Sequence, residues 1–149
     1  MVKHDESVIG VEHELGSFTV TQEAVDSYCE ALGETNPLYL DEEFARSTPY
    51  GGRIAPPLIF TTVNFREVLP DPKVEFGNAR FLGGERVEVL EPMRSGDTIT
   101  AYAQVAQVYE KTGRSGRMVF VVRRTRYVNQ HGHDVVLVDS SMVHREIES

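Results

Sequence analysis

The chain has 149 residues and a formal net charge of −8 at pH 7. This length is most simply one domain with its own core, so residues 1–149 are predicted to form a single domain. The negative charge argues against nucleic acid or an anionic membrane as the main partner. The one cysteine, Cys29, cannot form an internal disulfide.

The first ten residues are charged and lack the apolar stretch of a secretory signal. No apolar run in the sequence approaches the length of a membrane span. We therefore expect a cytoplasmic protein with neither a membrane nor a nucleic acid as its partner.

The first predicted elements are a short strand over Leu15–Val20 and a helix over Thr21–Leu32. Thr21 is a favourable N-cap, and apolar residues recur behind it at helical spacing, which predicts one buried helix face. Gly33 follows the last periodic residue and is expected to end the helix.

A second helix is predicted over Leu58–Leu69, where apolar residues fall on nearly every side of the first turns. Such a pattern indicates a helix surrounded by protein. Thr61, Thr62 and Val63 are poor helix formers, so this prediction requires tertiary burial to override local propensity.

The remainder of the chain is predicted to be strand. The expected strands are separated by short turns rich in Gly, Asn and Ser, which is typical of a meander of long antiparallel strands. They cover Gly83–Leu90, Thr98–Tyr109, Arg117–Val128 and Asp134–His144. One buried helix with an antiparallel sheet around it predicts the α+β class.

The segment between the two predicted helices, Gly33–Phe60, carries a recognisable pattern. It resembles the signature of the MaoC-like (R)-specific enoyl-CoA hydratase and 3-hydroxyacyl-thioester dehydratase family, Asp-x-Asn-Pro-x-His-x-Asp followed by a glycine-containing turn and Ile-Ala-His-Gly. The matching positions are Asn36-Pro37-Leu38, Asp41, Phe44-Ala45, Tyr50-Gly51 and Ile54-Ala55. The later stretch E-P-M-R-S-G-D-T-I-T also resembles the family, so the likeness extends over roughly Phe18 to Arg145 and implies a hot-dog fold.

The sequence departs from this signature at three functional positions. Glu34 stands where the family has its catalytic Asp, Tyr39 where it has its catalytic His, and Pro57 where it has a Gly whose N–H polarises the thioester carbonyl. A phenol with a pKa of about 10 is a poor base at pH 7, and proline has no N–H to donate. We therefore interpret Glu34, Asn36 and Tyr39 as degenerate catalytic positions that are inactive in this chain.

The resemblance then implies the accessory, non-catalytic half of a heterodimeric hydratase or dehydratase. Its partner would be a hot-dog subunit with an intact Asp/His dyad. The start of the predicted second helix, A-P-P-L-I-F, resembles this accessory class. Two alternatives remain open: a self-sufficient homodimeric hydratase that uses Glu34, and a protein that binds acyl thioesters without catalysis.

Ile54, Ala55 and Pro57 are the predicted acyl-binding residues, because the resemblance places them at the start of the central helix. Arg124 and Arg126 share one face of a predicted strand, and Arg123 lies on the other. The pair on one face is a candidate for the phosphates of an acyl-CoA or the pantetheine arm of an acyl carrier protein. A solvated sheet face is the alternative reading.

No further chemistry is predicted. The histidines do not combine with Cys or Asp at metal-ligand spacing, so neither a metal nor a cofactor is expected. Glu67 would suggest a thioesterase carboxylate on the second helix. It lies near the predicted end of that helix beside Arg66, which favours a surface role.

Overall fold

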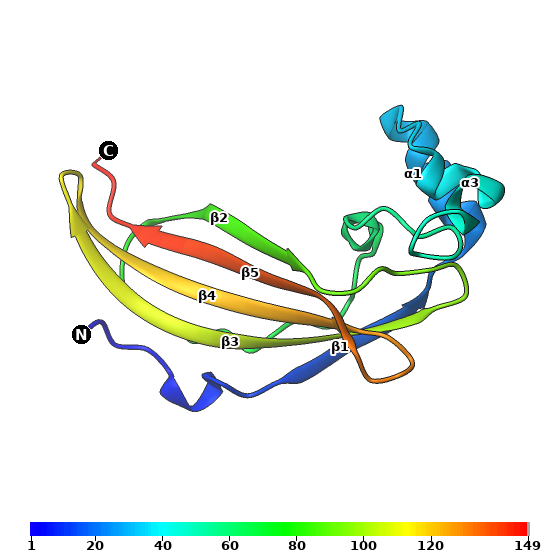
Figure 1. Ribbon diagram of the computed structural model, residues 1–149. Helices are drawn as coiled ribbons and strands as arrows, with labels where there is room; N and C mark the ends of the chain where they lie inside the picture. The colour runs from blue at the N-terminus through cyan, green and yellow to red at the C-terminus, as the bar shows by residue number, and fades with distance from the viewer. Residues whose placement is uncertain (149) are drawn as a thin grey trace.

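The computed structural model describes residues 1–148, and its framework is a five-stranded antiparallel sheet with the strand order β1-β3-β4-β5-β2 (Figure 1). The expected α+β hot-dog class is confirmed. The strands are β1 His13–Thr19, β2 Ala79–Val89, β3 Thr98–Gly113, β4 Gly116–Val128 and β5 Asp134–Arg145. Strand β2 lies at one edge of the sheet, and β1 lies at the other.

Alternation along the long strands gives the sheet an inner, core-facing side. In β4 the residues Val119, Val121 and Tyr127 are all buried, and they occupy odd positions of an uninterrupted strand. Since side chains alternate between the two faces, the odd positions of β4 face the core and the even positions face outward.

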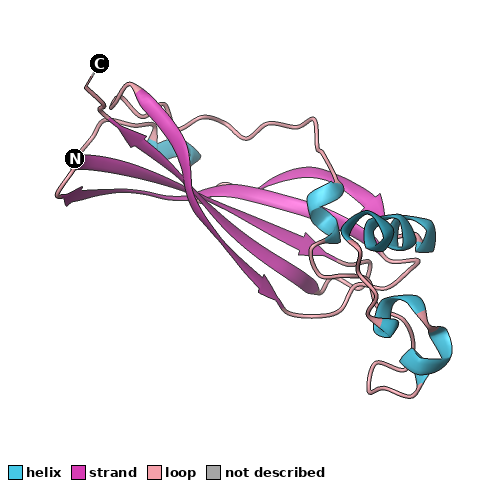
Figure 2. Cartoon of the chain, turned by 90° about the horizontal axis from the view of Figure 1, so that it is seen from above, coloured by secondary structure: helices cyan, strands magenta, loops and turns pink. Residues whose placement is uncertain are grey.

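Three short α-helices lie together at one end of the sheet, as Figures 1 and 2 show. Helix α1 spans Gln22–Leu32, begins at the predicted cap Thr21 and ends at Gly33, whose φ of 67° is the left-handed conformation that glycine adopts easily. Helices α2, Pro37–Leu40, and α3, Glu42–Arg46, follow it. A 3-10 turn, η1, occupies Glu6–Val8.

The predicted helix over Leu58–Leu69 is wrong. Only a 3-10 turn, η2, forms over Ile59–Thr62, and residues 63–78 contain no helix and no strand. Within η2, Ile59 and Phe60 are buried, whereas Val68 further along is 82% exposed. Burial therefore anchors the start of this segment and returns at Leu69, which is 8% exposed, while most residues between them are exposed.

Local chemistry explains why the helix stops. The hydroxyl of Thr61 donates to the carbonyl of Leu58, and the hydroxyl of Thr62 donates to that of Ile59. These back-bonds compete with the backbone for the carbonyls of the first turn and disfavour propagation. Two β-branched threonines followed by Val63 also have low helix propensity, and the isolated burial of Leu69 does not offset it.

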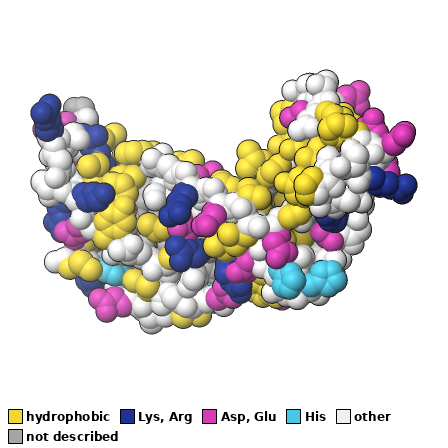
Figure 3. All heavy atoms as spheres, in the orientation of Figure 1, with side chains coloured by type: hydrophobic (Ala, Val, Ile, Leu, Met, Phe, Trp, Pro, Cys, Tyr) yellow, Lys and Arg dark blue, Asp and Glu magenta, His cyan; other side chains and the backbone are white. Residues whose placement is uncertain are grey.

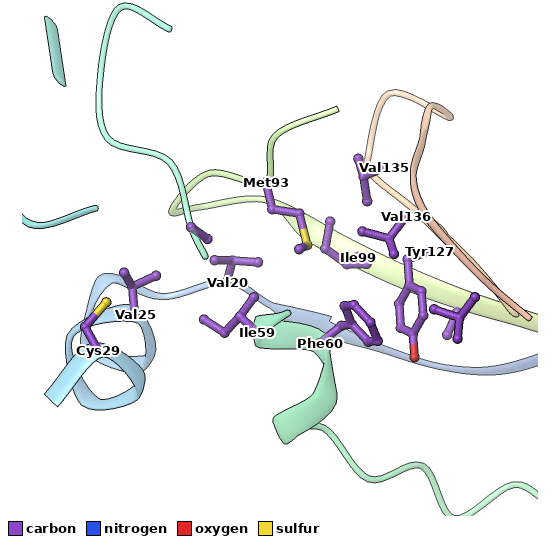
Figure 4. Close-up of a cluster of buried hydrophobic side chains, with 13 residues drawn as sticks. Val20, Val25, Cys29, Ile59, Phe60, Met93, Ile99, Tyr127, Val135 and Val136 are labelled. Atoms are coloured by element: carbon purple, nitrogen blue, oxygen red, sulfur yellow. The ribbon is translucent and has the colours of Figure 1, made fainter. Parts of the chain in front are cut away.

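The core consists of two clusters at opposite ends of the inner face. The first joins α1 and η2 to the sheet and includes Val25, Phe60, Ile99 and Tyr127 (Figure 4). The second lies further along β3 and β4, and its members are Val2, Val74, Val105, Val108, Val119 and Val121. The rings of Phe60 and Tyr127 are tilted by 41° with their centroids 4.6 Å apart, and this contact ties η2 to the sheet.

We predict that Phe60→Ala lowers the free energy of unfolding by about 3–5 kcal/mol, because it leaves a cavity against Tyr127 in the first cluster. Val68→Ala, in the same non-helical segment, is expected to change it by less than about 0.5 kcal/mol, since that side chain is in solvent. Urea unfolding of both variants measures these differences. A similar loss for the two would mean that the segment is packed along its whole length.

Candidate functional site

The degenerate signature positions lie on the loop that joins α1 to α2. The carboxylate of Glu34 accepts a hydrogen bond from the backbone N–H of Asn36 at 2.8 Å. The side chain of Asn36 in turn caps α2 by accepting from the N–H of Leu38 at 3.0 Å. Both side chains therefore satisfy backbone donors of their own loop, which is how short polar residues stabilise a helix start after a break.

Tyr39 lies on α2, half-buried against the first core cluster. Burial raises the pKa of its phenol, and the nearby Glu34 carboxylate raises it further, because both disfavour a negative charge on the ring oxygen. At neutral pH this group is a protonated phenol and cannot act as a base.

The predicted acyl-binding residues come together at the start of η2. Ile54, Ala55 and Pro57 line a hollow of about 210 Å³ together with Tyr50 and Met93. The loop to their N-terminal side connects them to the signature, since the N–H of Ile54 donates to the carbonyl of Leu38 at 3.3 Å. The N–H of Ala55 is occupied by the carbonyl of Met93 at 2.7 Å.

The hollow opens onto exposed apolar side chains. Tyr50, Leu58, Val89 and Leu90 are each more than two-fifths exposed, and the last two belong to or follow the edge strand β2. The space-filling view shows hydrophobic side chains gathered where the helical end of the molecule meets a saddle-shaped edge (Figure 3). A patch of this kind next to an unpaired strand edge is a surface suited to association.

Arg124 and Arg126 lie elsewhere, on the outer face of the sheet. Arg124 makes a two-bonded ion pair with Asp139, both contacts at 2.8 Å. Arg126 pairs with Glu12 at 2.9 Å and with Asp134 at 2.7 Å. The hydrogen bonds from these guanidinium groups lower the pKa of Glu12 and of Asp139, so their charges are already matched by carboxylates.

This arrangement is a poor acid–base centre. Hydration of an enoyl thioester needs a base titrating near neutrality and a donor on the thioester oxygen. Here the carboxylate of Glu34 is engaged by its own loop, Tyr39 is a protonated phenol, and Pro57 has no N–H to donate. Within residues 1–148, no cluster of three His, Cys, Asp or Glu side chains could hold a metal ion. No helix in that range could span a membrane.

Two features of the hollow were not predicted. Tyr50 was seen in the sequence only as part of a turn, and Met93 only as part of a strand entry, yet both line the hollow beside Ile54 and Ala55. The only sequence signal for Tyr50 is its position directly before the turn residues Gly51-Gly52. Nothing in the sequence indicates that Met93 reaches the site.

The geometry defines a hot-dog domain of the dehydratase type, and comparison with known proteins agrees. A model of the FAS1-like dehydratase domain region matches residues 7–138. The chain belongs to this family. Among curated proteins, a UPF0336 protein of Streptomyces griseus is 30% identical over 101 residues, which are 65% of this chain and 67% of that protein. A UPF0336 protein of Streptomyces avermitilis is 26% identical over 149 residues, or 97% of each chain.

Solved structures show the same fold. A monoamine oxidase regulatory protein from Archaeoglobus has a TM-score of 0.72 at 26% identity and covers 99% of this chain and 97% of its own. The ChsH1-ChsH2 complex of Mycobacterium tuberculosis gives 0.74 at 18% identity over 94% and 85%. The HadBC (3R)-hydroxyacyl-ACP dehydratase complex of the same organism gives 0.69 at 21% over 93% and 98%. The last two similarities establish the fold alone.

We predict that the phenol of Tyr39 titrates above the ordinary tyrosine value of about 10. Folding favours the neutral phenol, so this contribution to stability is complete below pH 10. It is lost as the pH rises through the higher pKa of the folded state. Absorbance titration near 295 nm of the native protein and of Tyr39→Phe isolates this group as a difference. A difference that titrates at or below pH 10 would contradict the buried placement.

Proposed function

We propose that this chain is the non-catalytic half of a two-subunit hydratase or dehydratase that acts on enoyl or 3-hydroxyacyl thioesters. The observation that supports this proposal is which residues stand at the signature positions. Where the reaction requires an imidazole, the chain has a phenol held neutral by burial and by Glu34. The catalytic Asp and His are then supplied by the partner subunit.

The surface supports a partner of the same fold. The exposed apolar side chains beside the hollow of Ile54 and Pro57 adjoin β2, whose outer edge is not paired to another strand of the sheet. A partner hot-dog subunit that pairs with this edge would cover both the patch and the open backbone groups. Two structural relatives with this fold were solved as complexes of two different chains, ChsH1-ChsH2 and HadBC.

The roles of the site residues follow from this proposal. Ile54, Ala55 and Pro57 form the wall of the acyl-binding hollow that faces the partner. Arg124 and Arg126 bind the phosphates of coenzyme A or of a carrier-protein arm by exchanging their carboxylate partners for phosphate oxygens. Glu34 and Asn36 keep the loop in shape and take no part in proton transfer.

A second candidate function rests on Glu34. Its carboxylate is exposed and lies close enough to Tyr39 to influence the phenol electrostatically. A self-sufficient homodimeric hydratase would use this carboxylate alone as its base. A third possibility is thioester binding without catalysis, which requires only the hollow lined by Ile54, Ala55 and Pro57.

We predict that the purified chain alone does not hydrate crotonyl-CoA. Co-expression with a hot-dog subunit that carries an intact Asp/His dyad should produce an active pair. In that pair, Glu34→Gln is expected to leave kcat/KM within about twofold, because the residue has no chemical role. Turnover by the isolated chain that is abolished by Glu34→Gln would instead establish the homodimeric enzyme.

We also predict that the triple change Glu34→Asp, Tyr39→His and Pro57→Gly creates weak hydratase activity in this chain. The histidine supplies a group that titrates near neutrality, the aspartate restores the shorter carboxylate, and the glycine returns a backbone N–H. Tyr39→His alone is expected to be inactive, since catalytic groups that act as a unit contribute non-additively. Equal activity of the single and the triple variants would show that the donor and the carboxylate do not matter.

A further inference from the structure

One arginine on the inner face of the sheet is not explained by the proposed site. Arg123 is at an odd position of β4, between the buried residues Val121 and Tyr127, so it shares their face of the sheet. In the register it is opposite Val105 on β3 and Ser140 on β5. Apolar residues are the expected occupants of this face, yet Arg123 is exposed to solvent there.

Arg123 has no protein partner in the described part of the chain. Other arginines of β4 are paired: Arg117 with Glu110 at 2.8 Å, and Arg124 with Asp139 at the same distance. Within residues 1–148 no ion pair and no side-chain hydrogen bond involves Arg123. Its charge is therefore available to a ligand without the displacement of a carboxylate, which the arginines on the outer face of the same strand would require.

Arg123 lies where two hollows of the inner face meet. One hollow is about 430 Å³ and the other about 440 Å³, and both are lined by Leu82, Arg123 and Met142. The non-helical segment after η2 forms part of their walls, through Asp71 and Pro72 in the first hollow and residues 67–69 in the second. The inner face is thus a groove with an apolar wall and one unpaired positive charge.

One wall of the first hollow is formed by His144, which is only 4% exposed. Its Nδ1 atom is enclosed by protein and has no hydrogen-bond partner among the described residues. His144 therefore closes this end of the hollow beside Arg123, and the guanidinium of Arg123 is the group that a ligand would meet.

The charges in the groove indicate which end of it takes an anion. In the first hollow, Arg80 is offset by Asp71 at 3.7 Å, which leaves Arg123 as the unbalanced charge. The second hollow is lined by Glu67 and Glu85, so it repels an anion. Its other walls are largely apolar and suit an alkyl chain.

We propose that this groove binds an aliphatic chain that ends in a carboxylate, with the carboxylate held by Arg123 beside His144. The alkyl part lies over Leu82 and Met142 and extends into the second hollow. Two sources share this chemistry: a free fatty acid, and the far end of an acyl thioester that carries a terminal carboxylate. The thioester source rests on the proposed function, whereas binding of the carboxylate itself does not.

The test uses the isolated chain, with decanoate and the neutral decan-1-ol as probes. Calorimetry is expected to give tighter binding for decanoate, and backbone amide shifts in its NMR titration should centre on Val121, Arg123 and Met142. Arg123→Gln should weaken decanoate binding roughly tenfold to a hundredfold, the range expected for the loss of a charged hydrogen bond. Its effect on decan-1-ol should be small.

Arg86→Gln is the matched control, because it removes the same charge from an exposed arginine of β2 on the outer face of the sheet. It should leave decanoate affinity unchanged, and circular dichroism establishes that both variants are folded. Equal binding of the acid and the alcohol would overturn the proposal. So would equal weakening by the two substitutions, or amide shifts confined to another part of the molecule.

The assembled two-subunit enzyme then distinguishes the two sources. Higher kcat/KM for an enoyl-CoA with a terminal carboxylate than for its methyl-ended counterpart, lost in Arg123→Gln, identifies the thioester as the ligand. No such preference, with decanoate still bound at Arg123, identifies a free acid. A pair without any hydratase activity would reject the proposed function. The decanoate titration would still show whether the groove binds a carboxylate at Arg123.

Discussion

The inner face of the sheet has to be shielded from water, and the way this chain shields it determines the rest of the structure. The cover is anchored by the contact of Phe60 with Tyr127, at one end of the face. Beyond Thr62 the backbone leaves the helical path, and the second anchor is the separate cluster of Val74 with Val105 and its neighbours. Between these anchors Leu69 is also buried, and the two hollows beside it leave the middle of the face partly open.

The open middle explains why a charged residue is tolerated there. A helix packed along the whole face would enclose the guanidinium of Arg123 in an apolar layer, at a cost that only a buried partner could offset. Because two hollows adjoin it, Arg123 remains exposed to solvent. The hydroxyls of Thr61 and Thr62, which end η2, therefore also determine what the groove can bind.

Much of the fold could be read from the sequence because its signals are local. Thr21 and Gly33 define α1 through a cap and a left-handed turn, and the alternation in β3 and β4 is strong enough to identify both strands. The second helix was mispredicted because its apolar pattern was taken as burial, although Val68 is in solvent. Local propensity was the better guide at Thr61 and Thr62, since no tertiary contact overrides it.

The candidate site could be predicted only in part, because only some of its contacts are local in the sequence. The hollow of Ile54, Ala55 and Pro57 follows from a contiguous motif, whereas Met93 reaches it through a chain reversal that no local pattern encodes. For Arg124 the strand alternation was correct, but its carboxylate partner, Asp139, lies on another strand and could be paired with it only through the register. Contacts between distant segments are the part of a site that a single sequence specifies least directly.

One short segment links the missing catalytic groups to the open groove. In the family signature, the residue at position 57 supplies a backbone donor and opens a helix that covers the inner face. Pro57 removes the donor, and the threonines that follow stop the helix within one turn. Under the proposed function, a subunit that leaves proton transfer to its partner no longer needs the donor, and the same stretch is free to leave space over the sheet. Loss of the backbone donor and gain of room for a ligand are, on this reading, results of two neighbouring changes, one at Pro57 and one at the threonines that end η2.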